Sequence, residues 1–215
     1  MKKKIAILDY GFGNTLSVLN ALKKCDAQPI ITRNDELISD ASGLIIPGVG
    51  AFEKCMNNIL KYGVDKIIFK FASSKKPILG ICLGLQILFQ QSFENGVHKG
   101  LGFLSGNIDR IDKFSLNKES LKIPHVTWSR LDVDLNYNCS ILKNIKSNQM
   151  VYFVHSYCVD KSSLTNKDIV KSHVNYFDVE IVAVVQKENI YGCQFHPEKS
   201  GVVGLNILKN FINIC

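Results

Sequence analysis

The stretch Pro77-Ile78-Leu79-Gly80-Ile81-Cys82-Leu83-Gly84-Leu85-Gln86 places a cysteine between an apolar run and a second apolar segment of helical periodicity. This pattern predicts a buried strand that turns directly into a helix, with Cys82 at the turn. The flanking glycines permit a tight turn and a close approach to the backbone. Because the first N–H groups of a helix have no partner within it and carry its positive end, they can stabilise a thiolate and an oxyanion. The stretch is therefore typical of a nucleophile elbow.

A free cysteine is more often a small buried hydrophobic residue than a nucleophile, so the glycine frame alone leaves the role of Cys82 open. A second segment, Gln194-Phe195-His196-Pro197-Glu198, adds a histidine that can act as a base and a carboxylate that can orient it. The His-x-Glu pair could instead bind a metal or form a buried ion pair, but no third and fourth ligand follow at a recognisable spacing. We predict Cys82, His196 and Glu198 as catalytic residues, with no metal and no cofactor.

Composition narrows the class of protein. The 215 residues, 46% hydrophobic and 21% charged, predict one globular domain over residues 1–215. No apolar run is long enough for a membrane span or a signal peptide. The seven cysteines show no C-x-x-C pair, which indicates a reducing compartment, and we expect the protein in the cytoplasm. The net charge of +7 is spread along the chain, so nucleic acid is not an expected partner, although an acidic protein face or an anionic ligand is favoured.

Strand-like and helical segments alternate in the first half, which predicts βαβ units and a parallel sheet, and shorter strands in the second half are expected to extend this sheet in antiparallel fashion. Strands are expected at 4–8, 29–31, 43–46, 77–81, 150–154, 179–185 and 190–195, with a hairpin turn at 186–189. Helices are expected around residues 16–22, from about 52 to 72 with a break near Gly63, from about 83 to 93, and over 204–214. Polar loops are expected at 113–122 and 160–168.

Two loops are expected at the same sheet edge as Cys82, because the carboxyl ends of parallel strands meet there. Pro47-Gly48-Val49-Gly50 can present backbone N–H groups to a ligand, so Gly48 and Gly50 are candidate substrate contacts. The N–H of Val49 and that of Leu83 are candidates for an oxyanion hole. A tight turn alone would also explain the two glycines.

Tyr152-Phe153-Val154-His155-Ser156-Tyr157 gathers polar side chains at the end of another strand, which favours substrate contacts at His155, Ser156 and Tyr157 over ordinary packing. Asp9-Tyr10-Gly11-Phe12-Gly13-Asn14 carries a G-x-G, but it lacks the third glycine of a dinucleotide fingerprint. We interpret it as a turn in which Asn14 caps the first helix.

These segments together resemble the class I glutamine amidotransferases nearly end to end, and within that class the glutaminase subunits of imidazole glycerol phosphate synthase. The Cys82 and His196-Pro197-Glu198 motifs are those of the superfamily. The opening motif, Pro-Gly-Val-Gly and Glu198-Lys199-Ser200-Gly201 are those of the subfamily. The resemblance implies an α/β fold of three layers, with a mostly parallel central sheet extended by antiparallel strands and the nucleophile elbow at Cys82.

The resemblance also implies hydrolysis of L-glutamine to glutamate and ammonia through a glutamyl thioester on Cys82. His196 would take the thiol proton, protonate the departing ammonia and then activate water, while Glu198 holds the imidazole. By similarity, Gln86, Glu94 and the segment Ser156-Tyr157 would hold the α-carboxylate and α-amino ends of the substrate.

A partner is implied as well: a HisF-type (β/α)8 cyclase that forms a heterodimer with this chain and uses the ammonia, passed internally, for imidazole glycerol phosphate and AICAR formation in histidine biosynthesis. The glutaminase would be poorly active without it, which a Val49 N–H pointing away from the oxyanion until docking would explain.

One segment departs from the family pattern. Ile123-Pro124-His125-Val126-Thr127-Trp128-Ser129 stands where the family usually has Pro-His-Met-Gly-Trp-Asn, so Thr127 replaces a glycine and Ser129 an asparagine. In the family this segment lies near the partner face. Two alternatives therefore stay open: a paralogous glutaminase that serves a surface-sugar amidotransferase, and a non-catalytic interaction subunit on the same fold.

Overall fold

The computed structural model describes residues 2–133 and 138–215. Within this part of the chain, the main sheet has the strand order β2-β1-β3-β4-β14-β13-β12-β9. Its parallel strands are β2 (Gln28–Thr32), β1 (Lys4–Leu8), β3 (Gly43–Ile46), β4 (Ile78–Ile81) and β14 (Ile190–Cys193). Its antiparallel strands are β13 (Val179–Lys187), β12 (Val170–Tyr176) and β9 (Asp132–Val133). The predicted fold class is confirmed.

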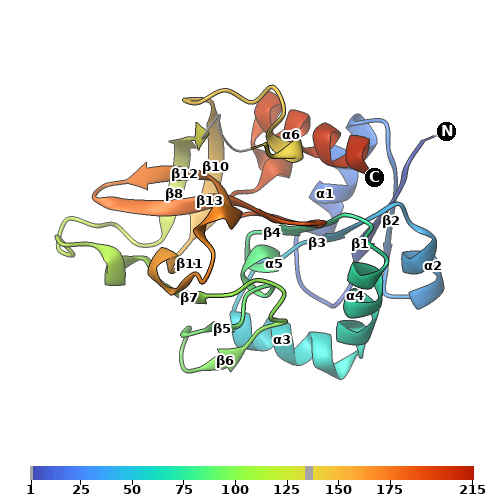
Figure 1. Cartoon of the computed structure of the whole chain (residues 1–215), viewed down its shortest axis with the longest axis horizontal. Coiled ribbons are helices and arrows are strands. Elements are labelled where there is room, and N and C mark those ends of the chain that lie inside the picture. Colours follow the sequence, from blue (N-terminus) through green and yellow to red (C-terminus); the bar gives the residue numbers. More distant parts are fainter. Residues whose placement is uncertain (1, 134–137) are drawn as a thin grey trace.

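Helices cover both faces of this sheet (Figure 1). On one face lie α1 (Thr15–Lys24) and α6 (Gly201–Ile214); on the other lie α2 (Asp35–Asp40), α3 (Phe52–Lys61) and α4 (Val64–Ser73). Side chains alternate along β1, so Ile5 and Ile7 join the core under α1 and α6, whereas Ala6 and Leu8 join the other core. The result is a three-layer arrangement with a separate hydrophobic core on each side of the sheet.

The predicted break between α3 and α4 is confirmed, but two expectations for α1 are wrong. The break near Gly63 is present, because this residue has a φ of +66° between α3 and α4. Leu16, expected on the apolar side of the first helix, is exposed, and Val18 is buried in the core instead. Asn14 stands at the N-terminal cap of α1, but its side chain accepts no capping hydrogen bond.

The helix after Cys82 is much shorter than predicted. α5 spans only Leu83–Gln86, and β5 (Gln91–Ser92) follows where the helix was expected to continue. The chain leaves the helix because residues 101–104 supply competing donors: the N–H of Leu101 reaches the carbonyl of Ile87 at 2.7 Å, and that of Gly102 reaches Phe89 at 3.0 Å. Glu94 therefore lies beyond β5 rather than on the helix.

The prediction that strand 150–154 extends the main sheet was wrong. β10 (Met150–His155) pairs with β8 (His125–Arg130) in a separate two-stranded ribbon. Its neighbour toward the main sheet is the irregular chain after β14, since the carbonyl of Tyr152 accepts from the N–H of His196 at 3.0 Å. A second small sheet has the order β11-β7-β5-β6, with β11 (Tyr157–Val159), β7 (Asn107–Arg110) and β6 (His98–Lys99).

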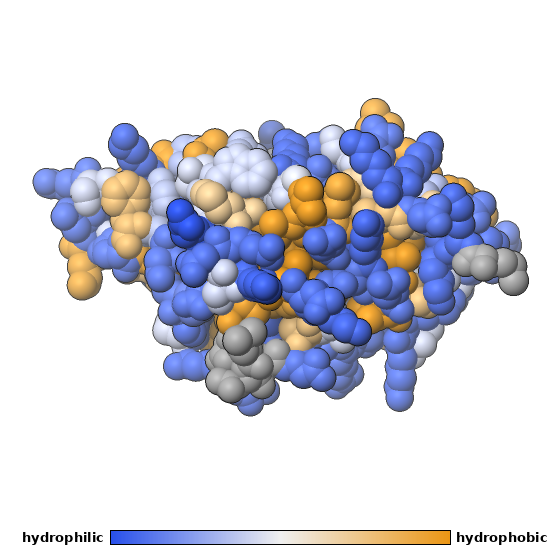
Figure 2. All heavy atoms as spheres, turned by 90° about the horizontal axis from the view of Figure 1, so that it is seen from above, coloured by the Kyte–Doolittle hydropathy of each residue, from blue (hydrophilic) through white to orange (hydrophobic). Residues whose placement is uncertain are grey.

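Short 3-10 helices lie in the connections of the described chain: η1 (Ile111–Phe114), η2 (Ser140–Leu142), η3 (Lys161–Ser163), η4 (Lys167–Ile169) and η5 (Pro197–Lys199). The loops expected at 113–122 and 160–168 therefore include helical turns. The face that carries α6 is largely hydrophilic, with hydrophobic side chains gathered toward its centre (Figure 2). Over residues 2–133 and 138–215, no helix combines the length and the hydropathy needed to span a membrane.

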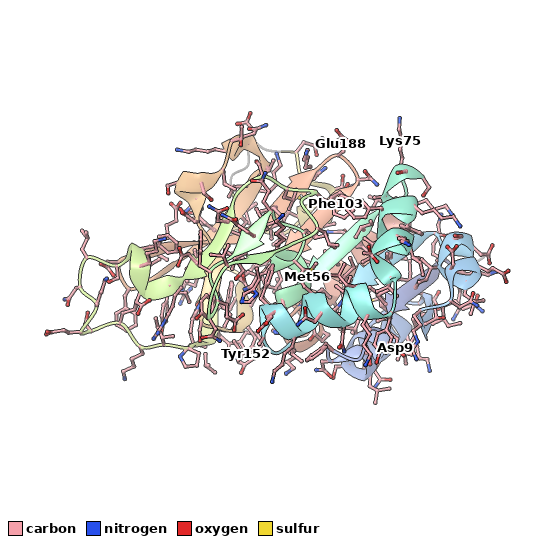
Figure 3. The ribbon with its side chains drawn as sticks, turned by 90° about the horizontal axis from the view of Figure 1, so that it is seen from below. Asp9, Met56, Lys75, Phe103, Tyr152 and Glu188 are labelled. Carbon is pink, nitrogen blue, oxygen red and sulfur yellow. The ribbon has the colours of Figure 1, made fainter. Side chains whose placement is uncertain are left out.

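The two ends of the parallel strands lie toward opposite edges of the molecule (Figure 3). Figure 3 shows Asp9, which follows β1, and Tyr152 of β10 toward one edge of the molecule, and Lys75 and Glu188 toward the other. Lys75 precedes β4, and Glu188 lies in the turn between β13 and β14. The first edge is thus the one where the parallel strands end, and Cys82 follows β4 at that edge.

Candidate active site

Cys82 occupies a strained turn between β4 and α5. Its φ is +53° and its ψ is −111°, a conformation that residues other than glycine rarely adopt. Backbone hydrogen bonds hold the residue on both sides: its N–H donates to the carbonyl of Cys193 at 2.8 Å, and its carbonyl accepts from the N–H of Leu85 at 3.0 Å. The elbow predicted from the sequence is present, although α5 has only one turn and contributes little helix dipole.

Three glycines let the backbone close around this elbow. A Cβ on Gly84 would stand 1.9 Å from the carbonyl oxygen of Ile46, one on Gly80 would stand 2.5 Å from the oxygen of Gly84, and one on Gly48 would stand 2.3 Å from the nitrogen of Gly84. Gly48 was predicted to contact substrate, but it packs against α5 and does not line the pocket described below. Its role in this structure is close packing.

A pocket of about 440 Å³ lies over Cys82. It is lined by Val49, Gly50, Cys82, Leu83, Gln86, Glu94, Pro124, Val154, His155, Ser156, Tyr157, His196 and Lys199. The predicted site residues therefore meet in one place, apart from Gly48 and from Glu198, which lies behind His196. A larger hollow of about 850 Å³ between η2 and α6 contains none of the predicted catalytic residues.

His196 and Glu198 form a buried pair at the start of η5. The Nδ1 atom of His196 lies 2.8 Å from Oε1 of Glu198, and both side chains are at most 2% exposed. Burial alone would lower the pKa of His196, but Cys82 and Glu198 outweigh it and raise that pKa to about 10. His196 is thus favoured in its imidazolium form, and this is the form that would stabilise a thiolate on Cys82.

The other imidazole nitrogen of His196 is free for proton transfer. Nε2 is buried and has no partner that meets hydrogen-bond geometry among the described residues. Cys82 and His196 line the same pocket and Cys82 raises the pKa of His196, so the two groups are neighbours, although no hydrogen bond of regular geometry joins them. Such bonds commonly tighten only when a substrate is bound.

Gln86 and Glu94 both line the pocket and offer hydrogen-bond acceptors. The Nε2 group of Gln86 donates to the carbonyl of Tyr157 at 2.8 Å and to Oε1 of Gln194 at 3.1 Å. Both of its protons are therefore used, and only its oxygen remains for a ligand. Oε2 of Glu94 accepts from the N–H of Phe52 at 2.9 Å. Two acceptors that face one pocket suit the ammonium group of an amino acid.

His155 lines the pocket, but its ring nitrogens are both occupied. Nδ1 lies 2.8 Å from the carbonyl of Tyr157, and Nε2 lies 3.0 Å from Nδ1 of His125. Nε2 of His125 in turn lies 2.9 Å from Oγ of Ser129. Because a carbonyl can only accept, His155 carries its proton on Nδ1, His125 also carries its proton on Nδ1, and Ser129 donates. Both ring nitrogens of His155 are thus engaged within the protein, and a direct contact of this residue with substrate stays a prediction.

The neutral histidine pair predicts a loss of stability in acid. Burial lowers the pKa of His125 to about 4, and burial together with His125 lowers that of His155 to about 3. The unfolded chain binds these protons near pH 6.5, whereas the folded chain does not until the pH falls to about 4. The free energy of unfolding should therefore decrease between pH 6.5 and 4, by up to about 1.4 kcal/mol per pH unit for each histidine.

Urea unfolding at several pH values in this range measures the slope, and carboxylates that titrate there contribute to it as well. The variant His125→Gln isolates the histidine contribution, because all other titrating groups are retained. Its slope should be shallower than that of the original protein. Equal slopes would show that the pair is not held neutral.

Sequence reasoning missed His125 and Gln194 as parts of the site. His125 stacks on Phe153 and Tyr176, with ring centroids 4.8 and 4.0 Å away. Gln194 is fully buried two residues before His196. Gln194 and His196 lie beyond the end of β14 at Cys193 and two positions apart, and in a strand continued through them such positions would point to the same side, which was the available signal. Ser200, for which no role was assigned, bridges the carbonyl of His196 at 2.7 Å and the N–H of Tyr152 at 3.0 Å.

Comparison with known proteins places this site in a family. The family model of glutamine amidotransferase class-I matches residues 6–215. The chain belongs to the class-I glutamine amidotransferases, a family of enzymes. Solved structures agree on the fold: a structure described as glutamine amidotransferase superposes with a TM-score of 0.73 at 17% identity, covering 98% of this chain and 97% of that one. The structure of PurLQS from Thermotoga maritima gives 0.70 at 19% identity, covering 99% of each chain.

Closer relatives narrow the group. Imidazole glycerol phosphate synthase subunit HisH from Geobacillus sp. is 42% identical over 210 residues, which cover 98% of this chain and 96% of the relative. The subunit of the same name from Caldanaerobacter subterraneus is 44% identical over 207 residues, covering 96% of each chain. Within the class-I family, the chain therefore belongs with the HisH subunits, whose name implies a partner subunit.

Proposed function

We propose that this chain is a glutaminase subunit of histidine biosynthesis, which hydrolyses L-glutamine to glutamate and ammonia at Cys82. The thiolate attacks the side-chain amide carbon, and His196 protonates the departing ammonia, so that a glutamyl thioester remains on Cys82. His196 then takes a proton from water, which attacks the thioester and releases glutamate. The observation that carries this proposal is the strained Cys82 in one pocket with the buried pair of His196 and Glu198.

The substrate lies with its amide over Cys82 and its amino-acid end toward Gln86 and Glu94. The ammonium group donates hydrogen bonds to the oxygen of Gln86 and to the carboxylate of Glu94, whose Oε2 atom also accepts from the N–H of Phe52. Ser156 and Tyr157 line the same end and contact the α-carboxylate. Gly50, which has a φ of +102°, and the neighbouring Val49 border the pocket beside the reacting carbon.

Backbone N–H groups of Val49 and Leu83 form the oxyanion hole. Leu83 begins α5, so its N–H has no partner within the helix. Val49 is 39% exposed at the pocket, in a loop that a docked partner can reach. We expect docking to turn the Val49 N–H toward the oxyanion, which makes turnover depend on the partner.

Removal of the Val49 N–H tests this part of the mechanism. Val49→Pro should lower partner-stimulated glutamine hydrolysis by about a hundredfold or more, because one donor of an oxyanion hole is lost. Val49→Ala keeps the N–H and is the matched control, for which turnover should stay within a few-fold of the original. Equal activity of the two variants would show that the N–H of Val49 is not part of the oxyanion hole.

The partner is a HisF-type (β/α)8 cyclase, which receives the ammonia internally for imidazole glycerol phosphate and AICAR formation. In support, the ribbon of β8 and β10 borders the pocket through Val154 and through Pro124, which directly precedes β8, and it exposes apolar residues along its length. The exposed residues are Val126, Trp128 and Met150. All seven cysteines are free, which fits a cytoplasmic enzyme.

Purified proteins test the proposal as a whole. Glutamate formation is measured for this chain by itself, with a HisF-type cyclase and its nucleotide substrate, and with a surface-sugar amidotransferase of the paralogous system. The expected result is stimulation by the cyclase together with glutamine-dependent ring formation. Stimulation by the sugar enzyme alone would reassign the pathway, and no glutamate with either partner would contradict glutaminase activity.

A further inference from the structure

A buried carboxamide contacts the sulfur of Cys82. Gln194 follows β14 directly and is fully buried. Its Nε2 group lies 3.6 Å from Sγ of Cys82, within the longer range of sulfur acceptors, and its Oε1 accepts from Nε2 of Gln86 at 3.1 Å. The mechanism described above does not need Gln194, so these two contacts call for an explanation of their own.

The orientation of this carboxamide is determined by a distant backbone atom. The carbonyl of Tyr157 can only accept, so Gln86 must turn its NH₂ group toward it. The same NH₂ group faces Gln194, which must therefore present its oxygen to Gln86. Gln194 is left with its NH₂ group toward Cys82. A flip of either amide would set two acceptors or two donors against each other, so the donor at Cys82 is fixed.

We infer that Gln194 is a further polar partner of the nucleophile. Its NH₂ group donates a hydrogen bond to the sulfur of Cys82 and so stabilises the thiolate. The inference rests on the proposed function only in taking Cys82 as the nucleophile. A donor aimed at a charged acceptor is stronger than one aimed at a neutral group, so the bond favours the thiolate over the thiol. The carbonyl of Val154, 3.9 Å from Sγ, acts in the opposite direction because it can accept only from the thiol.

Gln194 also links the nucleophile to the substrate end of the pocket. An ammonium group bound at the oxygen of Gln86 would polarise that amide and strengthen its bond to Gln194, which in turn becomes a better donor to Cys82. Occupation of the amino-acid end would thereby favour the reactive form of the cysteine at the other end.

Several ionisable groups surround the sulfur and must stay constant in a test. They are His196 and Glu198 near η5, Tyr10 after β1, Cys193 at the end of β14, His155 of β10, and Glu94 and Lys199 in the pocket. The other six cysteines provide internal references, because burial raises the pKa of each of their thiols. A reagent that needs a thiolate should therefore modify Cys82 before them.

The experiment is alkylation of the full-length chain by iodoacetamide between pH 5 and 10, with the rate at Cys82 read from its peptide by mass spectrometry. Gln194→Met removes the donor with little change in shape, and Gln194→Glu replaces it by an acceptor. Gln186→Glu, at the opposite end of the β13–β14 hairpin, is the matched control. The midpoint of the pH profile should rise by about one to two pH units in Gln194→Met, and further in Gln194→Glu. The control should keep the original midpoint.

Midpoints within about 0.2 pH unit of the original in both folded Gln194 variants would overturn the inference. If both variants fail to fold, the original protein still decides the matter by NMR of its ¹⁵N-labelled glutamine side chains. One buried NH₂ pair should then shift on alkylation of Cys82, and no such shift would overturn the inference. Because alkylation needs no glutamine turnover, an inactive glutaminase with a responsive profile would contradict only the proposed function.

Discussion

Cys82→Ala is expected to lower glutamine hydrolysis in the presence of the partner at least about a thousandfold, to the background level. Without the sulfur no thioester can form, and His196 would have to activate water against an amide directly. The protein should fold normally, because a cysteine that is 6% exposed at a pocket wall leaves little cavity when one atom is removed. Coupled measurement of glutamate formation with and without the cyclase gives the result.

Two controls separate chemistry from structure in that experiment. Cys215→Ala removes a thiol at the end of α6, far along the chain from the pocket, and should leave turnover close to the original. Supply of free ammonia to the Cys82→Ala complex should restore ring formation by the partner, because only the source of ammonia is lost. Glutamine turnover that survived in Cys82→Ala would refute the thioester mechanism.

Gly84→Ala is expected to destabilise the protein by about 4 kcal/mol or more, the range reached only by severe core defects. The added Cβ would stand 1.9 Å from the oxygen of Ile46, a backbone atom of a central strand that cannot move without opening the sheet. The elbow and the end of β3 would have to separate, so the alkylation rate at Cys82 should change as well. Urea unfolding followed by circular dichroism measures the loss.

Gly63→Ala is the matched control for this change. Gly63 has a φ of +66°, so alanine there is also strained, but nothing lies within 4 Å of the added Cβ. It should cost only about 1–2 kcal/mol. A loss at Gly84 no larger than that at Gly63 would mean that the close approach of α5 to β3 is not required.

The elbow, and the presence of His196 and Glu198 beside it, could be predicted because their signals are local. One glycine stands two residues before Cys82 and another two residues after it, directly behind an apolar run, and this frame predicts the tight turn. His196 and Glu198 are likewise separated by a single residue at the end of an apolar strand. The parallel strands of the first half, β1, β2, β3 and β4, followed equally from short apolar runs, whereas β14, which was expected among the antiparallel strands, runs parallel to β4. All these features depend on residues that are neighbours in the sequence.

Features that depend on distant donors could not be predicted. α5 ends at Gln86 because N–H groups from residues 101–104 take the next carbonyls, and nothing near Gln86 indicates this. β10 pairs with β8 rather than with the main sheet, although its apolar alternation fits either position. The pairing of His155 with His125 could not be foreseen either, because His125 lies thirty positions earlier in the chain.

The carbonyl of Tyr157 has a further consequence for ligand selection. A carbonyl oxygen has two lone pairs, and here one accepts a hydrogen bond from Nδ1 of His155 and the other accepts one from Nε2 of Gln86. The oxygen is saturated, so a cationic group that enters the pocket finds no acceptor at this position. In the proposed binding mode, the ammonium group of an amino acid is therefore left to the oxygen of Gln86 and the carboxylate of Glu94, and a main-chain oxygen that does not bind the ligand helps to set its orientation.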